Sequence, residues 1–506
     1  MRPFNNIIIE KRSCIIIKFV VLAAGFVILF CGQDIYAQPP DTVWTQFFGG
    51  NDVDIGYCVQ QTTDGGYIIT GYTTSYGAGS RDVYLIKTDS SGDSLWTQTF
   101  GGDDWDVGFS VQQTTDGGYI IAGVTASFGA GNFDVYLIKT DSSGDILWTQ
   151  TFGGSSSEHG LSVQQTTDGG YIITGATASY GAGSNDVYLI KTDSFGDTLW
   201  TQTFGGSLFE WGSSVQQTTD GGYIITGYTF TYSAGMCDIY LIKTDSIGDI
   251  LWTQTFGGSS YTSTSGYSVQ QTSDGGYIVA GATDSYGAGV DDVYLIKTNS
   301  SGDSLWTQTF GGSNYDAGYS IQQTSDGGYI ITGKTASYGA GVDDVYLVKT
   351  NSIGDSLWTQ TFGGCSSDIS HSVQQTTDGG YIIAGSTNSY SYVVENFDVY
   401  LIKLQPETGI EEENEGCKLP VALAQINPNP FSSELSITYC IPGQTKVELT
   451  IFDLSGRLVE ELISDQLPAG THTVIWNPSE SIPNGCYLIE FNACGHHEVR
   501  RCLKLN

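Results

Sequence analysis

Positively charged residues are scarce in this sequence. Its 506 residues include 19 lysines and arginines against 54 aspartates and glutamates, for a formal net charge of -35. Such a chain repels phosphate groups, so binding to nucleic acid and to anionic membrane surfaces is excluded. Charged residues make up only 14% of the chain and methionine occurs twice, whereas glycine occurs 67 times and tyrosine 31 times. This composition favours turns and strands over helices and predicts an all-β fold.

The common catalytic motifs are also missing. The sequence contains no G-x-S-x-G turn, no HExxH pair, no G-x-x-x-x-G-K phosphate loop and no EF-hand loop. Only two of its five histidines, His159 and His371, lie in the repeated part described below. We therefore assign no catalytic residue and predict that the protein is not an enzyme. Glycoside cleavage by paired carboxylates stays open as an alternative, because the separation of acids is invisible in a sequence.

The N-terminal region has the pattern of a secretory signal peptide. Basic residues precede an apolar run over 19–30, and Ile35 and Ala37 occupy the -3 and -1 positions of a cleavage site before Gln38. The run is shorter than the roughly 20 residues that span a bilayer, which favours removal of residues 1–37 over a membrane anchor. No membrane span is then expected to remain.

Tryptophan marks an internal repeat with a spacing of 52 residues and one step of 54. The repeated positions are Trp44, Trp96, Trp148, Trp200, Trp252, Trp306 and Trp358. Each unit contains four short apolar segments, for example 108–114, 119–125, 134–139 and 147–152, joined by Asp-Gly and Ser-Gly-Asp turns that suit tight hairpins. Units of this length with four strands are typical of β-propeller blades, and the tryptophans are predicted to pack between them.

The order of the segments predicts how the array closes. It begins on a segment of the fourth type, 44–48, and ends on one of the third type, 398–404, so the first strand is expected to complete the last sheet. Residues 41–404 are predicted to form a closed seven-bladed β-propeller of four-stranded antiparallel blades. With their GG, GxxxVTG-like and D-(A/V)-(F/Y)-(L/V) segments, the units resemble the bacterial seven-bladed β-propeller repeat family. The resemblance covers all seven units and implies the fold, but that family has no single activity.

The copies differ mainly at one end of the predicted blades, in the loop after FGG and the loop before DVYLIK. We call this end the variable face and predict that it binds the ligand, because function commonly resides in loops on a rigid scaffold. An acid begins six of the seven first strands there. These candidate ligand-binding and metal-binding acids are Asp54, Asp106, Glu158, Glu210, Asp316 and Asp368. Their carboxylates could hold Ca²⁺ or bind sugar hydroxyls, and capping of backbone N–H groups is the alternative.

Aromatic residues of the variable face form two sets. Those of the first set are not repeated between copies, so the fold does not demand them and they are the better ligand candidates. They are Trp105, Phe209, Trp211 and Tyr315. The second set recurs beside the Gly-rich loop in every copy, and anchoring of that loop is favoured over stacking on sugars. Its members are Tyr76, Phe128, Tyr180, Tyr232, Tyr286, Tyr338 and Tyr390.

The C-terminal part follows a different pattern. Residues 405–418 are acidic and poor in apolar residues, which predicts a solvated linker. Residues 419–506 contain about seven short alternating strands broken by Pro and Gly turns, typical of a small Ig-like β-sandwich. Its marker residues are Pro428, Asn429, Pro430, Phe431, Gly456, Gly470, Gly485 and Lys504. With them, this part resembles the type IX secretion system C-terminal sorting domain, and it is similar to the Ig-like domain of flagellar hook-capping proteins.

That resemblance implies where the protein goes. It implies export by the type IX machinery across the outer membrane of a Gram-negative bacterium, followed by release or attachment to the cell surface. The predicted function is therefore that of an exported binding module, for extracellular carbohydrate first and for protein second. The alternatives are a polysaccharide hydrolase or lyase that uses two of the acids, and a structural surface or adhesion protein.

Overall fold

The computed structural model describes residues 39–258, 261–391 and 396–407 of the repeat region, together with seven stretches of the tail. Those stretches are 422–427, 431–441, 445–454, 456–467, 470–479, 482–493 and 496–505. The predicted signal peptide and residues 408–418 of the predicted linker lie outside the described residues. All elements within the described stretches are β-strands, which confirms the all-β prediction. In these stretches no helix has the length and apolarity required to traverse a bilayer.

The repeat region consists of four-stranded antiparallel blades, and in six of them the four strands are consecutive in the sequence. The first strands are β2 (Asp54–Gln61), β6 (Asp106–Gln113), β10 (Glu158–Gln165), β14 (Glu210–Gln217), β18 (Thr264–Gln271), β22 (Asp316–Gln323) and β26 (Asp368–Gln375). The second strands are β3 (Tyr67–Thr73), β7 (Tyr119–Thr125), β11 (Tyr171–Thr177), β15 (Tyr223–Thr229), β19 (Tyr277–Thr283), β23 (Tyr329–Thr335) and β27 (Tyr381–Thr387). The third strands are β4 (Asp82–Thr88), β8 (Asp134–Thr140), β12 (Asp186–Thr192), β16 (Asp238–Thr244), β20 (Asp292–Thr298), β24 (Asp344–Thr350) and β28 (Asp398–Leu404). The fourth strands are β1 (Thr42–Phe48), β5 (Ser94–Phe100), β9 (Ile146–Phe152), β13 (Thr198–Phe204), β17 (Ile250–Phe256), β21 (Ser304–Phe310) and β25 (Ser356–Phe362).

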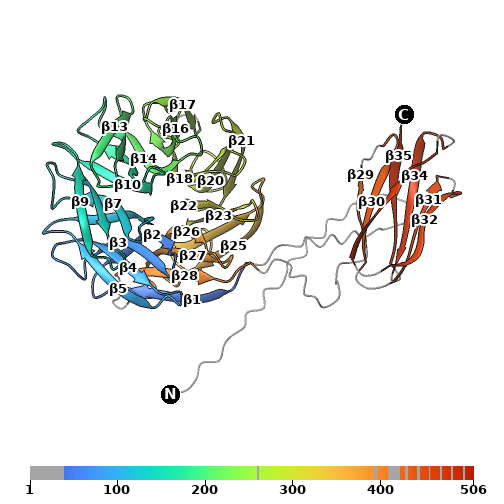
Figure 1. The fold of residues 1–506 in the computed structure, drawn as a ribbon, viewed down its shortest axis with the longest axis horizontal. Coiled ribbons are helices and arrows are strands. Elements are labelled where there is room, and N and C mark those ends of the chain that lie inside the picture. Colours follow the sequence, from blue (N-terminus) through green and yellow to red (C-terminus); the bar gives the residue numbers. More distant parts are fainter. Residues whose placement is uncertain are drawn as a thin grey trace, which may run out of the picture.

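The two ends of the described repeat region meet in one sheet. Its described residues form seven four-stranded sheets, and one of these joins β1 to β26, β27 and β28. Strand β1 pairs with β28 in antiparallel register, with Gln46 opposite Leu401. Figure 1 shows the sheets arranged around a common centre, with β1 beside β28. The predicted pairing of the first strand with the last sheet is therefore observed.

Neighbouring blades pack through an aromatic pair. Trp96 of β5 meets Tyr119 of the next blade edge-on, with ring centroids 5.9 Å apart. The same pair recurs at seven junctions, at 5.8 to 6.2 Å. This confirms that the repeated tryptophans pack between blades. They are half-buried, apart from the buried Trp358, because the fourth strand is the outer edge of each blade and faces solvent.

The first strand is the inner edge of each blade, and side chains of the preceding blade accept hydrogen bonds from its backbone N–H groups. The backbone N–H of Gln113 donates to Oε1 of Gln60, and the N–H of Val163 donates to Oγ of Ser110. The glutamine bond recurs at all seven junctions, at 2.5 to 2.6 Å, including the one from Gln61 to Gln374. Unpaired N–H groups of an edge strand are costly, so these bonds explain why the V-Q-Q segment hardly changes between copies.

The end of the blades opposite the variable face, which we call the turn face, holds a repeated ion pair. Buried Lys87 places Nζ 2.9 Å from Oδ2 of Asp64 and also donates to the carbonyl of Thr88 at 2.8 Å. Each of the seven copies has this pair, at 2.7 to 3.0 Å.

The Asp-Gly turn of the same face needs a residue in the left-handed backbone conformation, and Gly117 supplies it with φ of 86°.

The described part of the tail forms two antiparallel sheets. The first contains β29 (Ala422–Asn427), β30 (Leu435–Ile441) and β33 (Gly470–Trp476); the second contains β31 (Thr445–Asp453), β32 (Leu458–Leu467), β34 (Gly485–Ala493) and β35 (His496–Lys504). Apolar residues of both sheets share one core. Of the predicted marker residues, Phe431 is buried in that core and Lys504 donates to the carbonyl of Ile482 at 2.7 Å. Residues 428–430 lie outside the described residues, and the finer classification as an Ig-like sandwich stays a prediction.

Candidate functional site

A β-bulge in each first strand turns one side chain toward a shared cavity. In β2 the pairing with β3 passes from Gly56 to Cys58, so Tyr57 is the extra residue of the bulge, and the same shift recurs in every first strand. Such bulges commonly re-aim a side chain. The bulged residues are Tyr57, Phe109, Leu161, Ser213, Tyr267, Tyr319 and His371. They line a cavity of about 590 Å³ together with Trp211, Tyr228 and Phe230, and we call it the aromatic basin.

Ring contacts join most of the bulged residues into a continuous wall. Tyr319 contacts His371 at 5.6 Å, and Tyr57 contacts both His371 at 5.0 Å and Phe109 at 5.1 Å, between ring centroids. A second wall comes from one blade, where Trp211 and Tyr228 lie nearly parallel at 6.3 Å. The bulges of β10 and β14 carry the smaller side chains Leu161 and Ser213. The basin therefore combines aromatic rings with smaller side chains in one lining.

The basin is uncharged at neutral pH. Its lining contains no Asp, Glu, Lys or Arg. Burial, with a smaller contribution from the charge of Lys334, lowers the pKa of His371 to about 4. Burial, with a smaller contribution from Tyr72, raises the pKa of Tyr57 to about 12. This arrangement suits stacking and hydrogen bonding by Ser213, Ser263 and Ser265 rather than ion pairing.

The six acids at the start of the first strands do not lie on the surface, which corrects the prediction that they contact a ligand. Each is fully buried, with 0% exposure. Glu210 accepts hydrogen bonds from the N–H of Gly206 at 2.7 Å, the hydroxyl of Thr229 at 2.9 Å and the N–H of Thr231 at 3.0 Å. Glu158 accepts the equivalent three bonds, and Asp368 accepts from Gly364, Thr387 and Ser389. Asp54, Asp106 and Asp316 each accept two bonds at Oδ2, from a glycine N–H and a serine hydroxyl. They are internal caps, the alternative that the sequence left open, because the loop after FGG folds over them.

These acids also do not converge on one cation. Each belongs to a different blade, and its nearest acidic neighbour is the aspartate that begins the third strand of the preceding blade. A Cβ on Gly205 would lie 2.0 Å from Oδ1 of Asp186 and 2.5 Å from Oε2 of Glu210, so one glycine separates the two carboxylates. Within the described stretches, no three His, Cys, Asp or Glu residues are grouped to hold a metal ion.

The predicted aromatic candidates occupy different places. Trp211 lines the basin, whereas Trp105, Phe209 and Tyr315 lie on the surrounding loops with 43%, 49% and 51% exposure. One face of the Trp105 ring is covered, because the guanidinium carbon of Arg81 lies 3.9 Å from its centroid. Among the four predicted residues, only Trp211 is therefore part of the basin.

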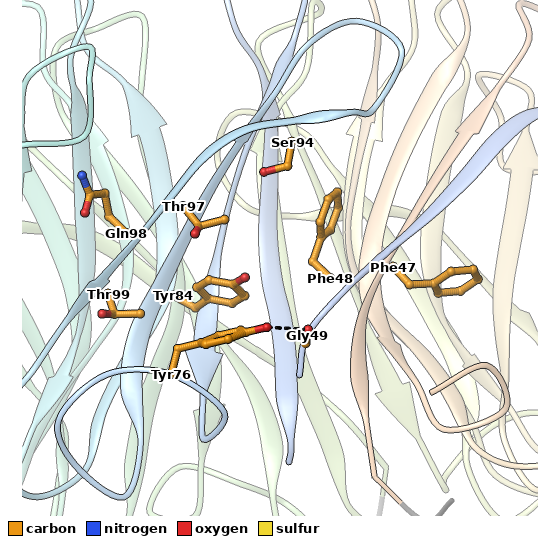
Figure 2. Close-up of a pocket in the computed structure, with 9 residues that line it drawn as sticks. All are labelled: Phe47, Phe48, Gly49, Tyr76, Tyr84, Ser94, Thr97, Gln98 and Thr99. Atoms are coloured by element: carbon orange, nitrogen blue, oxygen red, sulfur yellow. Dashed lines mark hydrogen bonds between the residues drawn. The ribbon is translucent and has the colours of Figure 1, made fainter. Parts of the chain in front are cut away.

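The second aromatic set anchors loops, as expected. Figure 2 shows the hydroxyl of Tyr76 directed at the carbonyl of Gly49, to which it donates at 2.8 Å, with Tyr84 packed beside it in a groove of about 520 Å³. The five other tyrosines of the set donate to the equivalent glycine at 2.6 to 2.9 Å. Phe128 has no hydroxyl and contributes only its ring. These grooves recur between blades and are part of the scaffold.

The bulged residues were missed in the sequence, although a signal was present. Within the otherwise constant segment G-x-S-V-Q-Q, the position x reads Tyr, Phe, Leu, Ser, Tyr, Tyr and His in successive copies. Variation in the loops is the more common sign of a binding surface, because side chains within a strand are usually constrained by packing. A variable position inside a constant strand was the indication that this side chain faces a cavity.

The tail identifies the export route. Residues 425–504 match the family described as the secretion system C-terminal sorting domain. The chain is thus a propeller-type repeat protein that ends in a type IX sorting domain. It is secreted by a Gram-negative bacterium or held at the outer-membrane cell surface.

Similarity to other proteins is distant. The regulatory protein FlaEY of Caulobacter vibrioides is 26% identical over 212 residues, which cover 37% of this chain and 22% of FlaEY. The chain therefore spans less than a quarter of that relative's length. Among solved structures, Sqt1 from Chaetomium thermophilum gives a TM-score of 0.41 at 11% identity, over 69% of this chain and 82% of that one. A fungal alcohol oxidase of the AA5 family in complex with copper gives 0.44 at 10% identity, over 92% and 100%. At such TM-scores these likenesses support no conclusion about function.

Proposed function

We propose that residues 41–404 form a closed seven-bladed β-propeller that binds an extracellular carbohydrate in the aromatic basin. The observation that carries this proposal is the basin itself, where side chains from seven sheets meet and only their identity varies between copies. The sorting domain delivers the protein to the side of the outer membrane where such ligands occur.

Closure is supported by the place of the first strand in the last sheet and by two hydrogen bonds between the first and last sheets. Strand β1 pairs with β28, the N–H of Gln61 donates to Oε1 of Gln374 at 2.6 Å, and the N–H of Val59 donates to Oγ of Ser372 at 3.2 Å. These bonds repeat those at the other junctions, so the scaffold has the same interface throughout. A ring without an open edge holds the basin residues in fixed positions.

The chemistry of the basin favours a sugar over the alternatives. Aromatic faces pack against the C–H faces of sugar rings, and hydroxyls beside them can bind sugar hydroxyls. The alternative of a hydrolase or lyase that uses two of the six acids is disfavoured, because these acids are buried and none lines the basin. A protein partner that inserts an apolar side chain is the second candidate, because the same rings would accept it.

Binding of neutral and acidic plant and algal polysaccharides to the mature full-length protein tests this function. We expect at least one to bind, Trp211→Ala to weaken binding about 10-fold or more, and binding to persist with a chelator. Phe195→Ala is the matched control, since this exposed ring lies in a Ser-Gly-Asp turn of the turn face. Absence of binding across the panel, or equal affinity of the Trp211→Ala protein, contradicts the proposal. Release of reducing ends would favour the enzymatic alternative.

A further inference from the structure

Arg81 differs from every other cation of the repeat region. Residues 41–404 contain a single arginine and eight lysines. Seven lysines are paired with aspartates at the turn face, and Lys334 lies 3.3 Å from Oδ1 of Asp343. Among the lysines and arginines of the described residues of this region, Arg81 alone has a side chain with neither an ion pair within 4.0 Å nor a hydrogen bond. A half-buried guanidinium on a chain of charge -35 thus has no carboxylate partner.

Two aromatic rings hold this guanidinium in place. Its Cζ lies 3.9 Å from the centroid of Trp105 and 4.6 Å from that of Tyr72. The backbone is fixed as well, because the carbonyl of Arg81 accepts the N–H of Asp106 at 2.9 Å. Stacking uses the faces of the planar group and leaves the N–H donors along its edge available. Such a preorganised fork matches the two oxygens of a carboxylate or a sulfate.

The fold does not require arginine at this position. The equivalent residues of the other copies are Phe133, Asn185, Cys237, Asp291, Asp343 and Phe397. Five of these make the same parallel bridge to the loop of the next blade, whatever their side chain. The backbone therefore forms its contact without Arg81, and the guanidinium and its two rings are particular to one junction.

That junction borders the aromatic basin. Tyr72 contacts the bulged residue Tyr57 at 6.1 Å between ring centroids, and Tyr57 lines the basin. We propose that Arg81 binds an oxyanion substituent, a carboxylate or a sulfate ester, on a glycan whose sugar rings stack in the basin. This proposal rests on the proposed function and narrows it to acidic polysaccharides. Trp105 then positions the guanidinium rather than stacking on a sugar.

Matched pairs of polysaccharides test the role of the charge. The probes are polygalacturonate and its methyl ester, and a sulfated galactan and its desulfated form, each titrated into the full-length protein. We expect one charged form to bind at least about 10-fold more tightly than its neutral partner, with affinity falling as salt rises. Arg81→Gln should abolish that preference while leaving affinity for the neutral form unchanged. Lys334→Gln, which removes a cation that already has a partner, should retain the preference.

The outcomes distinguish failure of the oxyanion role of Arg81 from failure of carbohydrate binding as a whole. If neutral and charged forms bind equally, or if the preference survives Arg81→Gln, the oxyanion role is wrong while carbohydrate binding stands. If no form binds, the proposed function itself fails. Preference in the uronate pair alone identifies a carboxylate, and preference in the galactan pair alone identifies a sulfate ester. Unchanged melting of the Arg81→Gln protein separates lost binding from lost folding.

Discussion

The two ends of the blades belong to the same strands but differ in how their buried charges are paired. At the turn face, every copy places one aspartate beside one buried lysine, for example Asp116 and Lys139 at 3.0 Å. At the variable face, six of the seven junctions bring two buried carboxylates together with no cation, for example Asp186 and Glu210. At the turn face, repeated ion pairs stabilise the fold. At the variable face, a layer of buried carboxylates does so beneath the surface. The surface above that layer is free to vary.

The difference has an electrostatic consequence. Burial acts to raise the pKa of Asp64, but hydrogen bonds from Thr62 and Lys87 outweigh it and lower the pKa to about 2. The six equivalent aspartates of the turn face are also shifted downward. Burial, with the charge of Glu210 adding to it, raises the pKa of Asp186. Asp54 and Asp344 at the variable face are shifted in the same direction, again mainly by burial.

The largest effect is expected from acid pH, because the lowered pKa of the turn-face aspartate recurs in all seven copies. A raised pKa means that the carboxyl contributes to stability below its usual value of 3.8 and that this is lost as pH rises through the raised pKa. A lowered pKa means that stability is present above 3.8 and is lost as pH falls toward about 2. The raised carboxyls of the variable face therefore act to increase the melting temperature as pH falls toward 3.8, whereas buried neutral His371, whose pKa is lowered to about 4, acts against them over the same range. Below about pH 4 the melting temperature should drop steeply, because the turn-face aspartates lose their ion pairs. Calorimetry of the full-length protein as a function of pH measures the sum of these contributions.

Single variants assign each contribution to its face. Asp186→Asn keeps an oxygen that can accept the N–H of Ala182 and Gly183, so it should remove the stabilising contribution of this carboxyl on mild acidification. Asp64→Asn should reduce the drop below pH about 4, since the ion pair to Lys87 no longer titrates. A profile unchanged by either variant would show that the two faces do not titrate in opposite directions.

The second effect concerns the buried caps. Glu210→Ala leaves the buried hydroxyl of Thr229 and two half-buried backbone N–H groups without their acceptor. It should destabilise the propeller by about 3 kcal/mol, which chemical denaturation measures. One blade has threonine at this position, and Thr264 shares a hydrogen bond of 3.0 Å with Thr283. Thr264→Ala should cost only about 1 kcal/mol. Equal costs would mean that the carboxylate caps add nothing beyond a hydroxyl.

The smallest effect concerns an irregular residue on the inner edge. Cys58 takes the place that serine holds in the other copies, and its thiol donates to the carbonyl of Val111 at 3.7 Å. Ser110, one blade on, instead accepts the N–H of Val163 at 3.2 Å. Cys58→Ser should restore the repeated bond and raise the free energy of unfolding by about 1 kcal/mol. Ser110→Cys should lower it by a similar amount, and a change in the opposite direction would refute this reading of the edge.

Local patterns predicted much of the scaffold but little of the site. The four segments of a unit correspond to strands, and the pairing of β1 with β28 followed from their order. The same reasoning placed Glu210 at the surface, although the loop after FGG covers it. The sequence also predicted an ordinary strand segment over 108–114, where Phe109 forms a bulge, because a bulge appears only when the register against β7 is known.

The repeat alone determined the strand order, the turns and the packing role of the tryptophans, because hairpins and alternating apolar residues are local properties. The motifs of the tail likewise indicated its role in export. Only the tertiary structure decided which side chains meet at the basin and which acids are buried. It also decided that Arg81 of one blade stacks on Trp105 of the next. Those contacts join residues of different sheets, and their geometry depends on how the blades twist and pack rather than on any local pattern.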